Sequence, residues 1–314
     1  MSSRIIPSRT PASDRQSPEN SFDRRRFLTA LGATAAGFAL PRTLRAELDP
    51  DWTTPMPPFR IAGNLHYVGS RDLASYLITS PRGHILINTN LVTSPTQIRA
   101  SIEKLGFTIP QVKIILISHG HYDHCAGSAE FKKLTGAKYL VMDADVSVIE
   151  SGGKTDFHYA SDPTMRFPAT KVDRALHDNE QITLGTTVMT AHKTAGHTKG
   201  CTTWTMTVAE GRKNLNAVIV GSPNVNTGYK LIDNPQYPQI AADFTRQFQT
   251  LQSLPCDIFL GAHGGYFGLI EKFAKKQAGD TTAFVDPTGY KSYIAERQQA
   301  FEAELARQQK GHPG

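Results

Sequence analysis

The chain has 314 residues, of which 39% are hydrophobic and 20% charged, a composition that suits a globular protein with a large core. The formal net charge is +6, but residues 1–46 hold eight Arg and three acidic residues, a net charge of +5, which leaves only +1 for the remainder. A near-neutral body argues against a nucleic-acid-binding function, so we expect no nucleic-acid partner.

The N-terminal residues have the pattern of a targeting segment. Three arginines at positions 24–26 precede a mildly apolar run, residues 27–40. This run is too short to cross a bilayer but suits the core of a signal peptide. The pattern resembles a twin-arginine signal, which exports folded proteins, and a retained basic arm is the alternative. We predict a signal segment at residues 1–46, cleaved after Ala46, and a single periplasmic domain at residues 47–314 with no membrane anchor in its mature form.

The body of the chain alternates between the patterns of strands and helices. Apolar or alternating segments bounded by Gly and Pro predict strands at 61–69, 74–79, 84–87, 112–117, 138–142, 201–208, 216–220 and 257–260, with shorter ones within 172–190. Helical spacing predicts helices at 94–105, 127–134, 240–251, 269–276 and 292–309, and another that opens at Asp143. This succession predicts an α/β fold in which helices cover β-sheets.

The sequence SHGHYDH, from Ser118 to His124, follows a predicted buried strand and precedes a predicted helix. Open α/β sheets place their chemistry on loops at this end of a strand. His119 and His121, two apart on extended backbone, can direct their imidazoles at one point. Asp123 and His124, turned by the start of the helix, can direct theirs at a second point close by. This spacing predicts metal binding rather than a polar turn.

Two later histidines have settings that suit metal ligands. His197 follows Gly196 beyond an apolar strand, and His263 lies among glycines after another strand. We predict one site from His119, His121 and His197 and a second from Asp123, His124 and His263. Imidazole and carboxylate ligands without thiolate favour Zn²⁺, so we expect two zinc ions per chain. Two such ions can share a hydroxide as the nucleophile, which indicates metal-assisted hydrolysis with Asp123 and His121 as catalytic residues.

The motif SHGHYDH with His197 and His263 resembles the metallo-β-lactamase superfamily over about residues 58–308. Five further segments resemble subclass B3, particularly the FEZ-type enzymes: SGGKTDFHYA, TAGHTKGCTTWTM, GYKLIDNPQYP, LPCDIFLGAHGG and FVDPTG. The resemblance implies an αβ/βα four-layer sandwich of two mixed β-sheets flanked by helices. It also implies hydrolysis of the β-lactam amide of penicillins, cephalosporins and carbapenems, and hence antibiotic resistance. The substrate-binding residues that it implies are Ser222, Asn226, Phe157 and Tyr159.

The residues after the strand 217–220 separate the members of this superfamily. Thioesterases and lactonases carry there an aspartate that bridges both metals, and subclass B1 lactamases carry a cysteine ligand. This chain has Gly221, Ser222 and Pro223 instead, which favours subclass B3. We therefore predict a monomeric di-zinc β-lactamase acting on small molecules. A hydrolase of other cyclic esters, such as a lactonase, and a catalytically silent metal-binding module are the alternatives.

Two positions depart from the pattern of the relatives. Many relatives end the third strand with Asp-Gly, whereas here Asn88 and Thr89 follow Ile87, which alters the hydrogen bonding around the site. FEZ-type enzymes pair the cysteine that matches Cys256 with one whose position is occupied here by Tyr290. We therefore expect Cys256 to be a free thiol.

Overall fold

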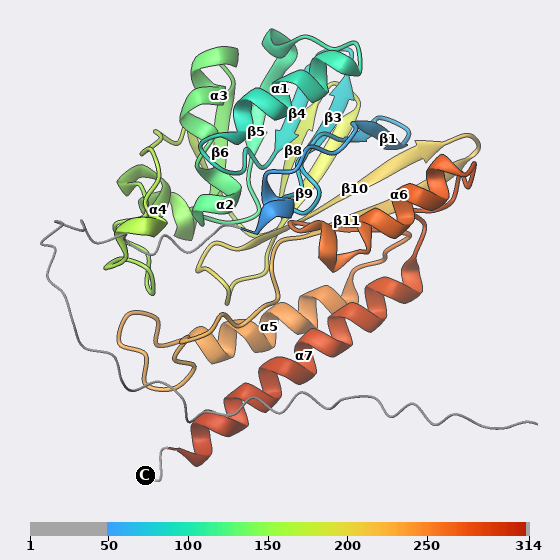
Figure 1. The fold of residues 1–314 in the computed structure, drawn as a ribbon. Coiled ribbons are helices and arrows are strands. Elements are labelled where there is room, and N and C mark those ends of the chain that lie inside the picture. Colours follow the sequence, from blue (N-terminus) through green and yellow to red (C-terminus); the bar gives the residue numbers. More distant parts are fainter. Residues whose placement is uncertain (1–48, 312–314) are drawn as a thin grey trace, which may run out of the picture. The chain divides into compact units, whose positions relative to one another are not determined.

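The strands of the chain form two mixed β-sheets, seen in a computed structural model that describes residues 49–311 (Figure 1). The predicted signal segment lies outside the described residues. The first sheet has the strand order β1-β2-β3-β4-β5-β6-β7. Its strands are β1 (Phe59–Ala62), β2 (Leu65–Tyr67), β3 (Tyr76–Ser80), β4 (Gly83–Ile87), β5 (Val112–Leu116), β6 (Lys138–Met142) and β7 (Arg174–Leu176). Pairing is antiparallel from β1 to β4 and parallel from β4 to β7.

The second sheet has the strand order β12-β11-β10-β9-β8. Its strands are β8 (Glu180–Leu184), β9 (Thr187–Lys193), β10 (Thr202–Glu210), β11 (Lys213–Val220) and β12 (Ile258–Gly261). Only the β11–β12 pair is parallel, and the other pairs are antiparallel. Two mixed sheets with helices confirm the predicted α/β fold class.

Helices cover the outer faces of both sheets (Figure 1). On the first sheet these are α1 (Ser94–Lys104), α3 (Ser128–Thr135) and α4 (Val146–Ser151), with the short α2 (Tyr122–Cys125) at its edge. On the second they are α5 (Ile240–Ser253), α6 (Leu269–Gln277) and α7 (Pro287–Lys310). The structure thus has the four layers expected of an αβ/βα sandwich. Among the described helices, none is both long and apolar enough to cross a membrane.

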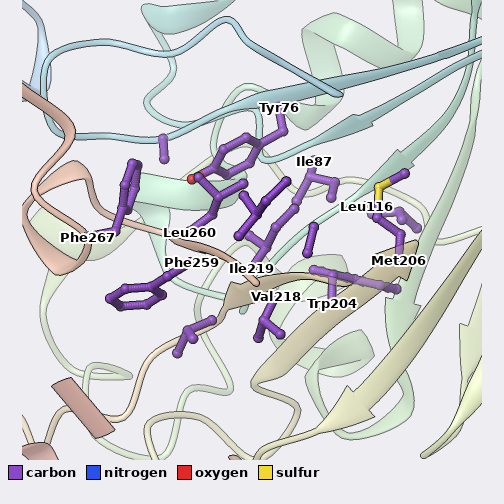
Figure 2. Packing of buried hydrophobic residues seen from close by; sticks show 14 of the residues in the cluster. Tyr76, Ile87, Leu116, Trp204, Met206, Val218, Ile219, Phe259, Leu260 and Phe267 are labelled. Carbon is purple, nitrogen blue, oxygen red and sulfur yellow. The ribbon is translucent and has the colours of Figure 1, made fainter. Parts of the chain in front are cut away.

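The main core lies between the two sheets and joins side chains from both, among them Ile87 and Leu116 from the first sheet and Trp204 and Val218 from the second (Figure 2). Successive residues of a buried strand point to opposite faces, so Leu86, next to Ile87, belongs to a second core beneath α1 and α3. The indole Nε1 of Trp204 donates a hydrogen bond to the backbone oxygen of Ile117, at 3.0 Å. This bond joins β10 to the end of β5, where the SHGHYDH motif begins.

Two of the predicted elements differ from those observed. The strand predicted at 61–69 is two short strands, because Gly63, with φ of 45°, turns the chain between them. The last helix begins at Pro287 rather than near residue 292. Asp286 caps it by accepting a hydrogen bond from the backbone N–H of Gly289, and proline is favoured at the first helical position.

All three cysteines, Cys125, Cys201 and Cys256, are free thiols. This finding confirms the prediction for Cys256. Burial raises the pKa of the Cys256 thiol to about 12, so the group stays protonated at neutral pH.

Candidate metal centre

The six predicted ligands converge at one edge of the sandwich, although they come from four separate segments. His119 and His121 follow β5, and Asp123 and His124 lie in α2. His197 lies in the loop between β9 and β10, and His263 follows β12. Five of the six residues are buried, and the side chain of the sixth, His263, is 16% exposed.

The ligand atoms form two overlapping groups. One atom each from His119, His121 and His197 lie within 4.8 Å of one another, as do atoms of His119, Asp123 and His124. The sixth residue, His263, adjoins the second group, with its Nε2 atom 3.5 Å from Oδ2 of Asp123. The structure therefore brings together every residue that the sequence analysis assigned to the two sites.

The chemistry of this cluster fits a metal that binds nitrogen. Burial, together with the neighbouring histidines, lowers the pKa of His119 well below its usual range, and burial lowers the pKa of His124. Burial also lowers the pKa of His197 to about 3, so these imidazoles are neutral and keep a lone pair. Both ring nitrogens of His124 are buried without a hydrogen-bond partner, and Nε2 lies 3.1 Å from Oδ2 of Asp123. Buried polar atoms are rarely left unpaired, so the cluster suits a Zn²⁺ ion.

Two of the histidines are oriented by a partner outside the cluster. Nδ1 of His197 donates a hydrogen bond to the backbone oxygen of Asn224, at 2.8 Å. Nδ1 of His263 lies 2.8 Å from Oδ2 of Asp72, whose other oxygen accepts the backbone N–H of Gly265. Such partners fix the tautomer and the ring orientation, and they leave Nε2 of each ring for the cluster.

Asp145, which is 1% exposed, joins the loops that carry ligands from the two sheets. Its carboxylate accepts the backbone N–H of Gly120, at 2.8 Å, between His119 and His121. It also accepts the backbone N–H of Gly200 at 2.8 Å and the hydroxyl of Thr198 at 2.7 Å, both just after His197. A Cβ atom at Gly200 would lie 2.7 Å from the carboxyl carbon of Asp145, so a side chain there would displace this carboxylate.

Asn88, which departs from the Asp-Gly of many relatives, follows the end of β4 and has a structural role. Asn88, with φ of 62°, accepts the backbone N–H of Ser118 through its side-chain oxygen, at 2.8 Å. Its side-chain nitrogen donates to the backbone oxygen of Ala74, at 3.2 Å. Asparagine tolerates the left-handed conformation better than most residues. Asn88 therefore anchors the start of the SHGHYDH motif.

A cavity of about 430 Å³ opens beside the cluster. Its walls outside the ligands include Trp52, Tyr122, Tyr159, Met165, Asn226 and Tyr266. Tyr159 and Asn226, both predicted to bind substrate, line it together, with Nδ2 of Asn226 3.0 Å from the Tyr159 hydroxyl. Trp52, Tyr122 and Met165 did not emerge from the sequence analysis. Trp52 is one of only two tryptophans, but nothing near it in sequence marks a site.

The other two predicted substrate contacts lie outside the lining of the cavity. Phe157 packs against the rings of Tyr229 and Tyr237, with ring centroids 5.0 and 5.1 Å apart. Ser222 is 1% exposed, and its hydroxyl lies 3.3 Å from that of Tyr266.

Comparisons with known proteins agree with this geometry. A model of the metallo-β-lactamase superfamily matches residues 71–210. The native FEZ-1 metallo-β-lactamase from Legionella gormanii is 55% identical, with a TM-score of 0.81 over 82% of this chain and 98% of that one. BJP-1, a subclass B3 metallo-β-lactamase of Bradyrhizobium japonicum, is 34% identical, with a TM-score of 0.78 over 83% of this chain and 98% of that one. The chain belongs to the subclass B3 metallo-β-lactamases.

Further similarities lie within and beyond this subclass. A class B3 di-zinc metallo-β-lactamase from an Alaskan soil metagenome is 35% identical, with a TM-score of 0.78 over 82% of this chain and 97% of that one. A curated metal-dependent hydrolase from Anaeromyxobacter sp. (strain K) is 33% identical over 84 residues, 26% of this chain. The chain spans only 30% of the length of that curated relative. These matches, which cover 82–83% of this chain and 97–98% of each relative, confirm the resemblance to subclass B3 that the sequence motifs indicated.

We predict that Asp145→Ala destabilises this metallo-β-lactamase even without metal. Two backbone N–H groups and a hydroxyl would lose their buried acceptor, which should lower the free energy of unfolding by about 3 kcal/mol. Urea denaturation of the metal-free protein measures this change. Asp143→Ala, two residues away and with its side chain 39% exposed, is the control and should cost less than about 1 kcal/mol. Equal losses in the two variants would contradict the role of Asp145.

We also predict that His263 titrates unusually high in the metal-free protein. Burial by itself would lower the pKa of His263, but the carboxylates of Asp123 and Asp72 outweigh it and raise that pKa to about 9. An unfolded histidine has a pKa of about 6.5. The interaction therefore stabilises the metal-free fold fully below about pH 6.5, and this stabilisation is lost as the pH rises through about 9.

Proton NMR of the imidazole resonances measures this titration directly. In Asp72→Asn the pKa of His263 should fall toward the ordinary value, because one of the two carboxylates is gone. Asp280→Asn, on an exposed turn, should leave it unchanged. A midpoint at or below pH 6.5 in the unaltered protein would refute the prediction.

Proposed function

We propose that this protein hydrolyses the amide bond of β-lactam antibiotics with zinc as its cofactor. The observation that carries the proposal is the set of five histidines and one aspartate around the cavity. His263 supplies the sixth ligand, and the loop after β11 offers Gly221, Ser222 and Pro223, with neither a bridging aspartate nor a cysteine. The 55% identity to a metallo-β-lactamase over nearly its whole length supports the same conclusion.

Two zinc ions per chain are part of the proposal. His119, His121 and His197 would hold one ion, and Asp123, His124 and His263 would hold the other. Bound zinc acts as a Lewis acid on a carbonyl group and lowers the pKa of water to about 7, so no Ser or Cys nucleophile is needed.

Asp123 is the one anionic group among the six ligands, and we assign it a catalytic role together with His121. Burial alone would raise the pKa of Asp123, but His124 and His263 together hold that pKa well below its usual range. The carboxylate is therefore ionised at neutral pH, where it can accept a hydrogen bond from water and orient it. His121, which directly precedes α2, would bind the metal of the other group together with His119 and His197.

The cavity walls suggest how a bicyclic antibiotic is held. Tyr159 and Asn226 offer a hydroxyl and an amide for the carbonyl or carboxylate of the substrate, while Trp52, Tyr122 and Met165 provide apolar surface. Among the described residues that line this cavity, none is Lys or Arg. Neutral donors, rather than an ion pair, would therefore recognise the carboxylate. Contacts from Phe157 and Ser222 stay predictions of the family resemblance.

We propose further that the protein acts as a monomer in the periplasm, with no membrane association in its mature form. The arginines at 24–26 and the apolar run after them support export by the twin-arginine route. Residues 1–46 would be the signal and residues 47–314 the single mature domain. Three free cysteines suit a protein that folds in a reducing compartment before export.

A kinetic panel on purified protein of measured zinc content tests the function. Benzylpenicillin, a cephalosporin and a carbapenem are assayed beside an acyl-homoserine lactone. We expect β-lactam turnover that disappears with chelator and returns with zinc. Turnover of the lactone with inert β-lactams would identify a lactonase instead, and no turnover at all with two bound zinc ions would indicate a silent binding module.

We predict that Asp123→Ala lowers kcat/KM for β-lactams by more than about 100-fold, since even the outer partners of ligands contribute 10- to 100-fold. Its zinc content should fall by one ion, measured by mass spectrometry of the metal. Asp280→Ala, on an exposed turn, should retain both activity and metal. Near-normal turnover with two zinc ions in the Asp123 variant would rule out the proposed second site.

We predict that replacing Arg24 and Arg25 by Lys keeps the protein out of the periplasm, because the twin-arginine route requires the arginine pair and not merely the charge. Fractionation followed by immunoblotting measures the distribution. Replacing Arg42 and Arg45 by Lys is the charge-matched control and should leave export intact. Unchanged export of the first variant would reject this route.

A further inference from the structure

The loop between α4 and β7, residues 152–173, places a buried carboxylate beside a proposed metal ligand. Asp156 is 5% exposed. Its Oδ1 atom accepts the backbone N–H of His158 at 2.7 Å and that of Tyr159 at 2.6 Å. This oxygen therefore fixes the backbone on which Tyr159 reaches the cavity.

The other oxygen of the same carboxylate faces His121. Oδ2 of Asp156 lies 3.6 Å from Nε2 of His121, and both atoms are buried without a hydrogen-bond partner. Within residues 49–311, no Lys or Arg pairs with Asp156. Since Nε2 of His121 is turned toward this carboxylate, the ring has Nδ1 left for the histidine cluster.

We propose that Asp156 is a positioning residue that couples metal binding at His121 to the order of the α4–β7 loop. The inference rests on the proposed metal site. A neutral imidazole that binds a metal through Nδ1 carries its proton on Nε2. That N–H has one acceptor within reach, Oδ2 of Asp156, and a hydrogen bond to a carboxylate is stronger than one between neutral groups. Metal binding would thus strengthen the hydrogen bond between His121 and Asp156. The other oxygen of Asp156 holds the backbone of His158 and Tyr159.

The consequence extends to Asn226, another residue that lines the cavity. The hydroxyl of Tyr159 accepts a hydrogen bond from Nδ2 of Asn226, at 3.0 Å. Asn226 lies two residues after Asn224, whose backbone oxygen orients His197. Asp156 therefore connects His121 to Tyr159, and Asn224 connects His197 to the segment that carries Asn226. His121 and His197 belong to the same group of proposed ligands. The empty and the metal-loaded protein should differ in how firmly these walls are held.

A purely structural role for Asp156 makes a different prediction. Its two bonds to backbone N–H groups two and three residues ahead form a local turn that asparagine makes equally well. Asp156→Asn would keep this acceptor at Oδ1 and place an NH₂ group opposite Nε2 of His121. If Asp156 only shapes the turn, this variant should behave like the unaltered protein. If Asp156 couples the loop to the metal, a donor would now face the N–H of a metal-bound imidazole.

Hydrogen–deuterium exchange of the peptide that contains His158 and Tyr159 tests the proposal at pH 8, with and without zinc. In the unaltered protein we expect zinc to slow exchange of this peptide about tenfold or more. In Asp156→Asn we expect the zinc-free rate to be unchanged and the slowing by zinc to be lost. Competition with a chromophoric chelator should show zinc affinity about 10- to 100-fold weaker in this variant.

The control is Asp162→Asn, which alters a carboxylate on the same loop that bonds Thr164 but contacts no histidine. It should keep both the zinc affinity and the slowing of exchange. Full slowing by zinc in Asp156→Asn, or none in the unaltered protein with zinc bound, would overturn the coupling and leave the metal site intact. Failure of the unaltered protein to bind zinc would instead refute the proposed function and, with it, this inference.

Discussion

The geometry of the site depends on one buried carboxylate that connects two loops with proposed ligands, one from each sheet. His119 and His121 lie on the loop that follows the first sheet's β5, and His197 lies on a loop of the second sheet. Asp145 accepts hydrogen bonds from the residues beside both sets of ligands. Burying an anion is unfavourable unless its oxygens are satisfied, and three donors meet that requirement here. The hydrogen bonds that satisfy the buried carboxylate thus also hold the two loops at a fixed distance.

The site holds several carboxylates that have no Lys or Arg partner among the described residues. The carboxylates of Asp72, Asp145 and Asp156 surround the histidine cluster, and within residues 49–311 none forms an ion pair with Lys or Arg. With Asp123 they place negative charge around a cluster in which burial lowers the pKa of His119, His124 and His197. Such an arrangement is unfavourable by itself and favourable around cations. We therefore expect metal affinity and folding free energy to be linked in this protein.

The proposed ligands were predictable from sequence, whereas the residues that hold them in place were not. The ligands follow strand ends and lie among glycines, and this local pattern is visible in the chain itself. Asp72 contacts His263, 191 residues later in the chain, and Asp145 bonds Gly200, 55 residues later. No local sequence pattern marks such contacts. Phe157, expected beside the substrate, packs on Tyr229 and Tyr237. An aromatic residue in a loop can line a site or fix the loop to the body of the protein, and the sequence does not distinguish the two roles. The start of α7 could have been found, since Asp286 and Pro287 form a recognisable capping sequence.

The short turn at Pro50–Trp52 joins the start of the described chain to the wall of the cavity. Asp51 forms an ion pair with Arg71 at 2.9 Å, and its backbone oxygen accepts the N–H of Asp72, the partner of His263. Trp52 lies against the rings of Tyr122 and His263. These contacts begin only a few residues after the proposed cleavage point. If the proposed signal is removed, cleavage a few residues further along the chain would remove part of the cavity wall.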